Sequence, residues 1–276
     1  MMKLLQAIRK KFPQHKYSIN VALLGDYSEC AWSNLGFWNE NNKNTYPQAC
    51  ENLANHLAQS LNLNSKDVLL DLGCGYGASL IFWKEKYLIE NIQAVELQES
   101  CIDIIKKQNI KNTSVFCDSY LNLKFIPFQN KFDVILCLDS AYHHTLNLFL
   151  DSVTQVLNSK GRVGFHTLML SDKWETLNSL QQKKYAWLLK AADVNLKVLN
   201  SKKDLEKSLN EFKFKKIKVE DLSQPVLLGF SNYVEKELEC NKKGIDFFKI
   251  KMTAKLCKKL FDDGVVCYVQ VTAEYE

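Results

Sequence analysis

Long apolar runs are missing from this sequence of 276 residues. No stretch approaches the roughly 18–20 consecutive apolar residues that a membrane-spanning helix needs. The N-terminus also lacks the apolar core of a secretory signal, because Met1 to Phe12 has the pattern of a short amphipathic helix. We therefore expect a cytoplasmic protein without a membrane span.

Cysteine pairs at metal-binding spacing are missing as well. The nine cysteines form no C-x-x-C pair, and their number is odd. Several, such as Cys137, lie inside apolar runs, where a free thiol behaves as a small hydrophobic group. The sequence thus predicts reduced thiols in a reducing compartment and no metal site.

A strong excess of one charge is the third absence. The net charge is +5, from 36 basic and 31 acidic residues. Much of the excess lysine lies in 199–218, where Glu206 and Glu211 are interspersed. This pattern favours a solvated surface, with a nucleic-acid or anionic-membrane surface as the alternative. We expect no nucleic-acid partner.

Strands and helices alternate in the middle of the chain. Segments 78–86, 100–108 and 146–157 carry helical periodicity, and short apolar runs lie between them. Apolar strands joined by helices predict a parallel sheet that is covered on both faces, so the expected fold class is doubly wound α/β. The runs expected as strands are 68–72, 92–96, 113–117, 132–138 and 162–168.

The parts on either side of this alternation differ from it. Tyr46-Pro47 opens a helix, with proline in its first turn. Further strands are expected at 214–220 and 264–274, with a helix over 235–260 between them. We expect four regions, which are N-terminal helices forming a lid (1–60), the cofactor-binding α/β core (61–170), a helical cap segment (171–212), and the last strands of the sheet with a helical insertion (213–276).

A glycine-rich turn follows the first expected strand, in the segment Leu70-Asp71-Leu72-Gly73-Cys74-Gly75-Tyr76-Gly77. Alternating glycines let the backbone bend sharply and approach a ligand closely, and the next helix offers unpaired N–H groups. The spacing G-x-G-x-G differs from the G-x-G-x-x-G of dinucleotide-binding proteins. A nucleotide-dependent oxidoreductase is therefore a less favoured alternative.

Together with Asp71 before the glycines, this spacing resembles the first motif of class I S-adenosylmethionine-dependent methyltransferases. Glu96 ends the second expected strand, where a carboxylate can accept hydrogen bonds from both ribose hydroxyls of an adenosine. The run Phe132-Asp133-Val134-Ile135 is also typical of the family. The resemblance implies S-adenosylmethionine as cofactor, S-adenosylhomocysteine as product, and a mostly parallel, seven-stranded sheet with a helical cap.

The same resemblance implies the cofactor contacts. In the family, an acid at the end of the third strand usually meets the adenine amino group, and residues after the fourth strand face the transferred methyl group. Aromatic residues before the core cover the cofactor. The contacts implied are Tyr27, Trp38, Asp71, Gly73, Gly75, Glu96, Leu97, Asp118, Ser119 and Leu138.

Tyr142-His143 and the segment Asn34-Leu35-Gly36-Phe37-Trp38 resemble a subgroup that methylates small molecules, including sugar O-methyltransferases and some N-methyltransferases. A small-molecule acceptor is therefore implied, with a hydroxyl, an amine or a carbon as the acceptor atom. A hydroxyl needs its proton removed, and a histidine of near-neutral pKa is the usual base. The histidines expected to act as this base or to orient the substrate are His143, His144 and His166.

Other functions stay open at this point. One is a methyltransferase that acts on a lipid or a macromolecule, although Leu138-Asp139-Ser140-Ala141 replaces the N-P-P-Y tetrad of enzymes acting on nucleobase or glutamine nitrogens. Another is a non-catalytic protein that binds S-adenosylmethionine and keeps Gly73, Gly75 and Glu96. The oligomeric state is also open.

Overall fold

The computed structural model of the chain describes residues 20–39, 43–191, 193–238 and 244–276. The helix expected at Met1 to Phe12 lies outside these ranges. Within them, every helix falls short of the length and apolar character needed to cross a membrane.

One mixed sheet of eight strands runs through the described part of the molecule. The strands are β1 (Val68–Leu72), β2 (Asn91–Glu96), β3 (Thr113–Cys117), β4 (Phe132–Cys137), β5 (Leu157–Leu170), β6 (Asn200–Ser201), β7 (Phe214–Asp221) and β8 (Val266–Tyr275). Their order is β3-β2-β1-β4-β5-β8-β7, and β6 pairs with β5. The strand order reverses between β1 and β4, and ligands of such sheets bind outside the carboxyl ends at this point.

The sheet is parallel except at β8, which runs antiparallel to both β5 and β7. The helices of the described chain are η1 (Val21–Leu24), α2 (Tyr46–Ser60), α3 (Ala78–Tyr87), α4 (Glu99–Gln108), η2 (Tyr120–Phe125), η3 (Ala141–His143), α5 (Leu146–Val156), η4 (Asp172–Thr176), α6 (Ser179–Ala191), η5 (Leu196–Val198), α7 (Lys202–Glu211), η6 (Gln224–Leu228), α8 (Gly229–Glu237) and α9 (Ile245–Asp263).

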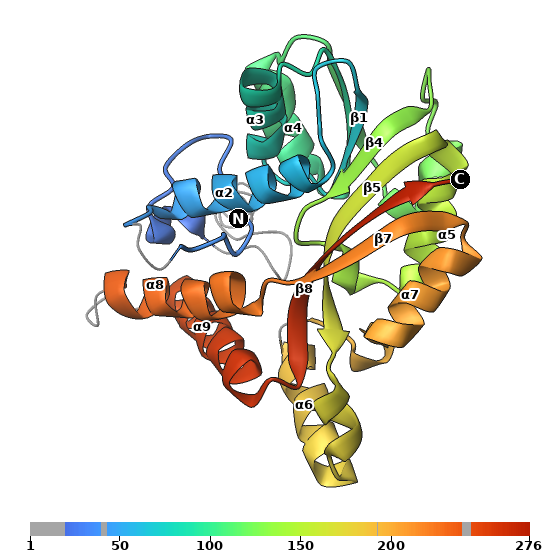
Figure 1. Cartoon of the computed structure of the whole chain (residues 1–276). Helices are drawn as coiled ribbons and strands as arrows, with labels where there is room; N and C mark the ends of the chain where they lie inside the picture. Colours follow the sequence, from blue (N-terminus) through green and yellow to red (C-terminus); the bar gives the residue numbers. More distant parts are fainter. Residues whose placement is uncertain (1–19, 40–42, 192, 239–243) are drawn as a thin grey trace, which may run out of the picture.

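Helices cover the sheet on both faces (Figure 1). Successive strand residues point to opposite faces. Leu69 of β1 therefore packs in a core with residues of α2, α3 and α4, whereas Leu70 packs in a second core with residues of α5 and α7. This arrangement confirms the doubly wound α/β fold.

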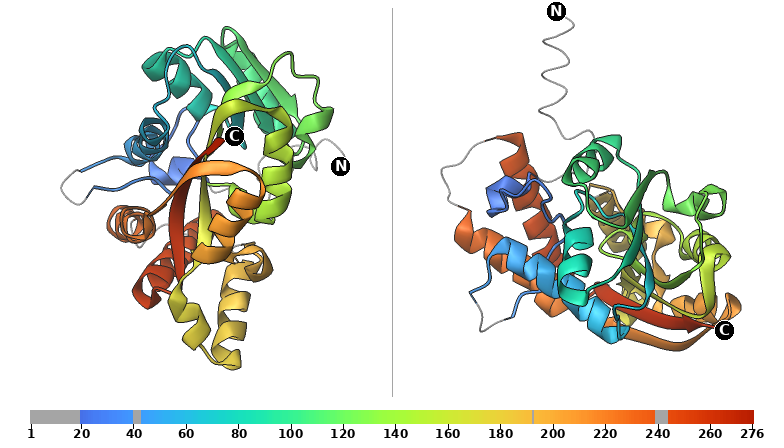
Figure 2. Two further views of the ribbon diagram at one scale, coloured as in Figure 1. Left: turned by 45° about the vertical axis from the view of Figure 1, so that its right-hand side comes forward. Right: turned by 90° about the horizontal axis from the view of Figure 1, so that it is seen from above.

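A third core forms a cap beyond the carboxyl ends of the parallel strands. It joins α2, α6, α8 and α9 through buried residues such as Tyr46, Phe230, Ile250 and Tyr268. Helices α8 and α9 lie near α2 and away from α5 and α7 (Figure 2). Because Val266 of β8 pairs with Leu170, the last residue of β5, the cap is continuous with the sheet.

Three details of the predicted elements are wrong. The main path of the sheet has the seven expected strands, but the two-residue β6 adds an eighth. Strand β5 begins at Leu157 because the expected turn at Lys160-Gly161 is accommodated as an irregularity, with Lys160 at φ 62°. The single helix expected over 235–260 is two helices, since Gly244 has φ 141°, which a continuous helix excludes.

Candidate functional site

The glycine-rich turn between β1 and α3 has a backbone that favours glycine. Gly73, Gly75 and Gly77 have φ values of 71°, 54° and 89°, in the left-handed region. A Cβ at Gly73 would lie 2.7 Å from the Ser140 Oγ, and a Cβ at Gly75 would lie 3.0 Å from the Ser33 Oγ. The turn is therefore in close contact with the exit of β4 and with the segment before α2.

Glu96 lies at the end of β2, and only 6% of its surface is exposed. Its Oε2 accepts a hydrogen bond from the backbone N–H of Gly75 at 2.9 Å, and its Oε1 accepts one from the N–H of Gln98 at 2.9 Å. The carboxylate is thus held against the glycine turn. A carboxylate has about four acceptor positions, so roughly two remain for ligand hydroxyls.

Asp71 lies beneath the turn and is fully buried. Its Oδ2 accepts a hydrogen bond from the Trp83 Nε1 on α3 at 2.7 Å. Burial raises the pKa of the Asp71 carboxyl to about 6. This geometry makes Asp71 a support that joins β1 to α3, and its predicted contact with the cofactor stays a prediction.

Asp118 and Ser119 lie at the end of β3, beside Glu96. The N–H of Asp118 donates to the Glu96 carbonyl at 3.2 Å, which joins the two strand ends. The Asp118 Oδ1 accepts hydrogen bonds from the Ser119 N–H at 2.6 Å and from the Asn122 side chain at 2.9 Å. Two acids that an adenosine would need therefore lie at neighbouring strand ends.

The other predicted cofactor contacts differ in their exposure and in their place in the fold. Leu97, directly after Glu96, is 61% exposed, and Leu138, directly after β4, is 9% exposed. Trp38 stacks on Tyr233 of α8 with 4.3 Å between ring centroids. Tyr27 is 83% exposed. The structure thus places the two leucines at strand ends and Trp38 in the cap, with Tyr27 on the surface.

His143 and His144 follow β4, in and just after η3, and both are partly buried. The rings of Tyr142 and His143 have centroids 4.6 Å apart, and His144 contacts Tyr120 edge-to-face at 5.4 Å. Burial lowers the pKa of His144. The Tyr120 hydroxyl donates to the Ser140 carbonyl at 3.0 Å, which fixes this loop near the glycine turn.

His166, on β5, is fully buried, and burial lowers its pKa to about 3. The Ser60 hydroxyl donates to the His56 carbonyl and accepts from the Gln270 Nε2, which leaves the Gln270 Oε1 to accept from the His166 Nε2–H at 3.2 Å. This chain assigns the proton of the neutral ring to Nε2. The His166 Nδ1 is then a buried acceptor without a hydrogen-bond partner among the described residues.

Asp139 is the centre of a polar cluster between the sheet and the cap. Its Oδ1 accepts hydrogen bonds from the hydroxyls of Tyr142 and Tyr268, each at 3.0 Å. Its Oδ2 accepts one from the N–H of Leu35 at 3.0 Å. Burial raises the pKa of the Asp139 carboxyl to about 6, although the three hydrogen bonds lower it.

Sequence reasoning did not assign a role to Asp139 or Tyr268. Asp139 had a local signal, because an acid directly after the fourth strand lies at the active edge of such a sheet. Tyr268 had none, since only the antiparallel insertion of β8 beside β5 brings its hydroxyl to Asp139. Two of the predicted histidines border this cluster: the His166 ring centroid lies 5.5 Å from that of Tyr268, and the His143 ring centroid lies 4.6 Å from that of Tyr142.

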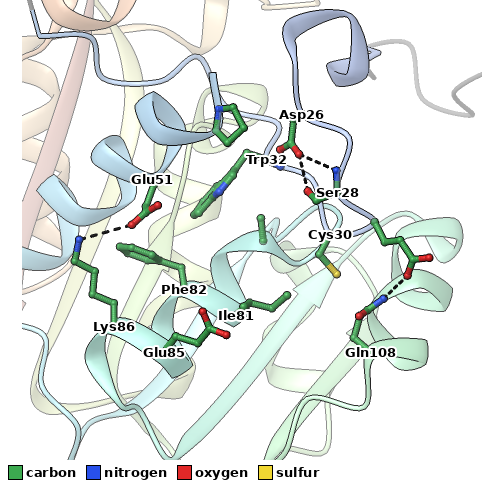
Figure 3. Close-up of a pocket in the computed structure, with 13 residues that line it drawn as sticks. Asp26, Ser28, Cys30, Trp32, Glu51, Ile81, Phe82, Glu85, Lys86 and Gln108 are labelled. Carbon is green, nitrogen blue, oxygen red and sulfur yellow. Dashed lines mark hydrogen bonds and ion pairs between the residues drawn. The ribbon is translucent and has the colours of Figure 1, made fainter. Parts of the chain in front are cut away.

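A hollow of about 820 Å³ opens between α2, α3 and the loop at 26–32 (Figure 3). Side chains of Ile81 and Phe82 on α3 line it, and the Trp32 ring contacts the Phe82 ring edge-to-face at 5.9 Å. At its rim, Lys86 pairs with Glu51 at 3.7 Å. The predicted cofactor contacts do not line this hollow, so it is separate from the sheet edge described above.

Comparison with known proteins finds similar sequences for the core of the chain. Residues 69–161 match a family of methyltransferase domains. The erythromycin 3''-O-methyltransferase of Saccharopolyspora erythraea is 30% identical over 122 residues, which are 42% of this chain and 39% of that protein. The glycine/sarcosine/dimethylglycine N-methyltransferase of Actinopolyspora halophila is 26% identical over 193 residues, 68% of this chain and 32% of that protein. The chain therefore spans only 39% and 32% of the length of these two relatives.

The likeness to solved structures extends over nearly the whole chain. A structure of geranyl diphosphate C-methyltransferase from Streptomyces coelicolor A3(2), in complex with Mg2+, geranyl diphosphate and S-adenosylhomocysteine, has a TM-score of 0.71 to this chain. The match covers 96% of this chain and 100% of that one, at 14% identity. It confirms that the expected Rossmann-like methyltransferase fold includes the cap as well as the core.

Proposed function

We propose that this chain methylates a small-molecule acceptor with S-adenosylmethionine as the methyl donor. Residues 69–161 match a methyltransferase domain family, and the fold is similar to that of a solved methyltransferase in complex with S-adenosylhomocysteine. The observation that carries this proposal is the meeting of the glycine turn, Glu96 and Asp118 at one edge of the sheet. The acceptor atom is an oxygen or a nitrogen, with carbon as a third alternative. The product of the donor is S-adenosylhomocysteine.

The residues at this edge fit an adenosyl cofactor. A Cβ at Gly73 would occupy space beside Ser140, so the turn depends on its missing side chain. Glu96 would bind the ribose hydroxyls through its remaining acceptor positions, and Asp118 would accept a hydrogen bond from the adenine amino group. When bound, the cofactor supplies an electrophilic methyl group on a sulfonium.

The chain's own residues have to align the acceptor and manage its proton. His143 and His144 lie in the loop that contacts the glycine turn through Ser140, which suits a base or an orienting group. Burial lowers the pKa of His144, which favours the neutral imidazole, the form that can accept a proton. Correct alignment alone lowers the barrier of a two-reactant step substantially.

Calorimetric titration of the purified chain with S-adenosylmethionine and S-adenosylhomocysteine tests the proposal. We expect dissociation constants on the order of micromolar for both, and at least tenfold weaker binding by Glu96→Ala, a loss of about 1.4 kcal/mol. Glu99→Ala, an exposed acid three residues further on, is the matched control and should bind as the unchanged chain does. If a folded sample freed of copurified ligand binds neither compound, the proposed function is wrong.

A further inference from the structure

Asp139 brings a carboxylate to the active edge of the sheet without belonging to the predicted cofactor contacts. It is the second residue after β4 and takes a φ of 50°, in the left-handed region. The next residue, Ser140, lies so close to the glycine turn that a Cβ on Gly73 would meet its Oγ at 2.7 Å. Asp139 is therefore the sequence neighbour of a residue that contacts the turn that would hold the methyl donor.

The carboxylate is held by three donors from three separate parts of the chain. These are the Leu35 N–H before α2, the Tyr142 hydroxyl in η3 and the Tyr268 hydroxyl on β8. A carboxylate offers about four acceptor positions, so roughly one is left on the Oδ2 side. The geometry thus provides a fixed acceptor that is not saturated.

The donors that hold this carboxylate are uncharged groups, namely one backbone N–H and two tyrosine hydroxyls. The Asp139 charge raises the pKa values of surrounding tyrosines and cysteines, namely Tyr46, Cys50, Cys137, Tyr142, Cys257 and Tyr268. A partly buried charge of this kind is normally paired. The surroundings of Asp139 therefore favour a cationic ligand.

His166 supplies a second, independent observation. Its Nδ1 is fully buried and has no hydrogen-bond partner in the described chain, while its Nε2–H is committed to Gln270. The ring lies 5.5 Å from that of Tyr268, whose hydroxyl bonds to Asp139. An anionic acceptor and a neutral acceptor thus belong to residues that contact the same tyrosine, and each can accept a hydrogen bond from an N–H donor.

We propose that the methyl acceptor is an amine and that Asp139 binds it in its ammonium form, an inference that rests on the proposed function. An ammonium group supplies both the missing positive charge and the missing donors, whereas a neutral hydroxyl supplies only a donor.

The chemistry of the step follows from this placement. The ammonium gives one proton to the Asp139 carboxylate, which leaves a neutral amine with a free electron pair. That pair forms the new N–C bond as the bond between methyl carbon and sulfur breaks, and the electron pair of the broken bond stays on sulfur. The positive charge moves from the donor to the methylated nitrogen.

Paired amine and alcohol probes test the inference on the unchanged chain saturated with S-adenosylhomocysteine. The pairs are methylamine with methanol, benzylamine with benzyl alcohol, and dimethylglycine with glycolic acid. In each pair a hydroxyl replaces the amino group. We expect at least one amine to bind tenfold or more tightly than its alcohol by calorimetry. If every alcohol binds as tightly as its amine, the inference is overturned without any variant being needed.

Variants then locate the preference for amines. Asp139→Asn should abolish it and leave the affinities for S-adenosylmethionine and S-adenosylhomocysteine within about twofold of normal, a difference of under ~1 kcal/mol. Asp133→Asn, at the opposite end of β4, is the matched control, because its carboxylate accepts hydrogen bonds from Val68 and Asn158, away from the glycine turn. Tyr142→Phe keeps the Asp139 carboxylate and should keep the preference, which covers the case in which Asp139→Asn fails to fold.

The outcomes of these titrations distinguish a failure of this inference from a failure of the proposed function. If Asp139→Asn weakens binding of S-adenosylmethionine but not of S-adenosylhomocysteine, the carboxylate pairs with the sulfonium of the donor and the inference is wrong. If the unchanged chain binds neither compound, the proposed function fails first. Retention of the amine preference in Asp139→Asn also contradicts the inference.

Discussion

Single residues at the sheet edge are held by neutral donors rather than by opposite charges. Asp71 shows this best, since its buried carboxylate accepts a hydrogen bond from the Trp83 indole. In Asp71→Ala this indole N–H would be buried without an acceptor, which costs about 1–3 kcal/mol. We expect the melting temperature to fall by about 2–12 °C.

Thermal unfolding followed by circular dichroism measures this change. Asp71→Asn is the control, because its side-chain oxygen still accepts from Trp83 and it should lose much less stability than Asp71→Ala. Equal melting temperatures for Asp71→Ala and the unchanged chain would show that the carboxylate does not support the turn.

The loop histidines make a separate prediction at the same scale. His143 lies after β4 and outside the adenosine contacts of Glu96 and Asp118, so His143→Ala should leave affinity for S-adenosylhomocysteine nearly unchanged. Removal of a base or an orienting group should lower turnover by about 100-fold or more. Steady-state formation of S-adenosylhomocysteine, with an acceptor found by screening, measures it. Full turnover in His143→Ala, alongside reduced turnover in His144→Ala, would transfer the role to His144.

At the scale of elements, the segment before α2 is fixed against the start of α8. A Cβ at Gly229 would lie 2.5 Å from the Trp38 Cβ, and the Trp38 N–H donates to the Pro225 carbonyl at 2.9 Å. Gly229→Ala should therefore displace Trp38 and destabilise the chain by about 1–3 kcal/mol. Since this segment carries the Leu35 N–H that bonds to Asp139 and includes Trp38, a predicted cofactor contact, we expect weaker binding of both the acceptor and the cofactor.

A matched substitution on the sheet separates these two effects. Gly164→Ala would place a Cβ 2.5 Å from the Leu61 Cδ1, so it should destabilise the chain to a similar extent. Gly164 lies away from Trp38. At a temperature where both variants are folded, Gly164→Ala should therefore bind the acceptor with normal affinity. Equal acceptor binding by the two variants would contradict a specific role of the Trp38 segment.

The elements also show how far the sequence predicts the structure. Strands β1 to β4 and helices α3 to α5 begin and end within one or two residues of their predicted bounds, because apolar runs and helical periodicity are local signals. The break between α8 and α9 and the early start of β5 depend on single positions, Gly244 and Lys160, whose backbone conformation the pattern does not determine.

The predictability of the site follows the same division between local and distant contacts. Glu96 and Asp118 end strands, so their meeting at one edge followed from the parallel sheet. The bond from Tyr268 to Asp139 depends on β8 lying between β5 and β7, a pairing of segments distant in sequence that carries no local signal.

At the scale of the whole molecule, the buried His166 makes stability depend on pH. Its folded pKa of about 3 lies below the ordinary value of 6.5, so between these pH values the unfolded chain binds one more proton than the folded chain. Stability should therefore fall as the pH is lowered from about 6.5 towards 3. The greatest slope from one such group is about 1.4 kcal/mol per pH unit.

The buried carboxyls of Asp71 and Asp139 act in the opposite direction. Their pKa values are raised to about 6, so the folded chain binds their protons more readily and gains stability as the pH falls from about 7 to 4. Because these groups are present with and without His166, the difference between the unchanged chain and His166→Asn isolates the histidine. Between pH 6.5 and 4.5 we expect the gap in melting temperature to change by about 2–5 °C per pH unit in favour of the variant. A constant gap across this range would mean that His166 takes up a proton in the folded chain, and it would then be a cation rather than an acceptor beside Tyr268.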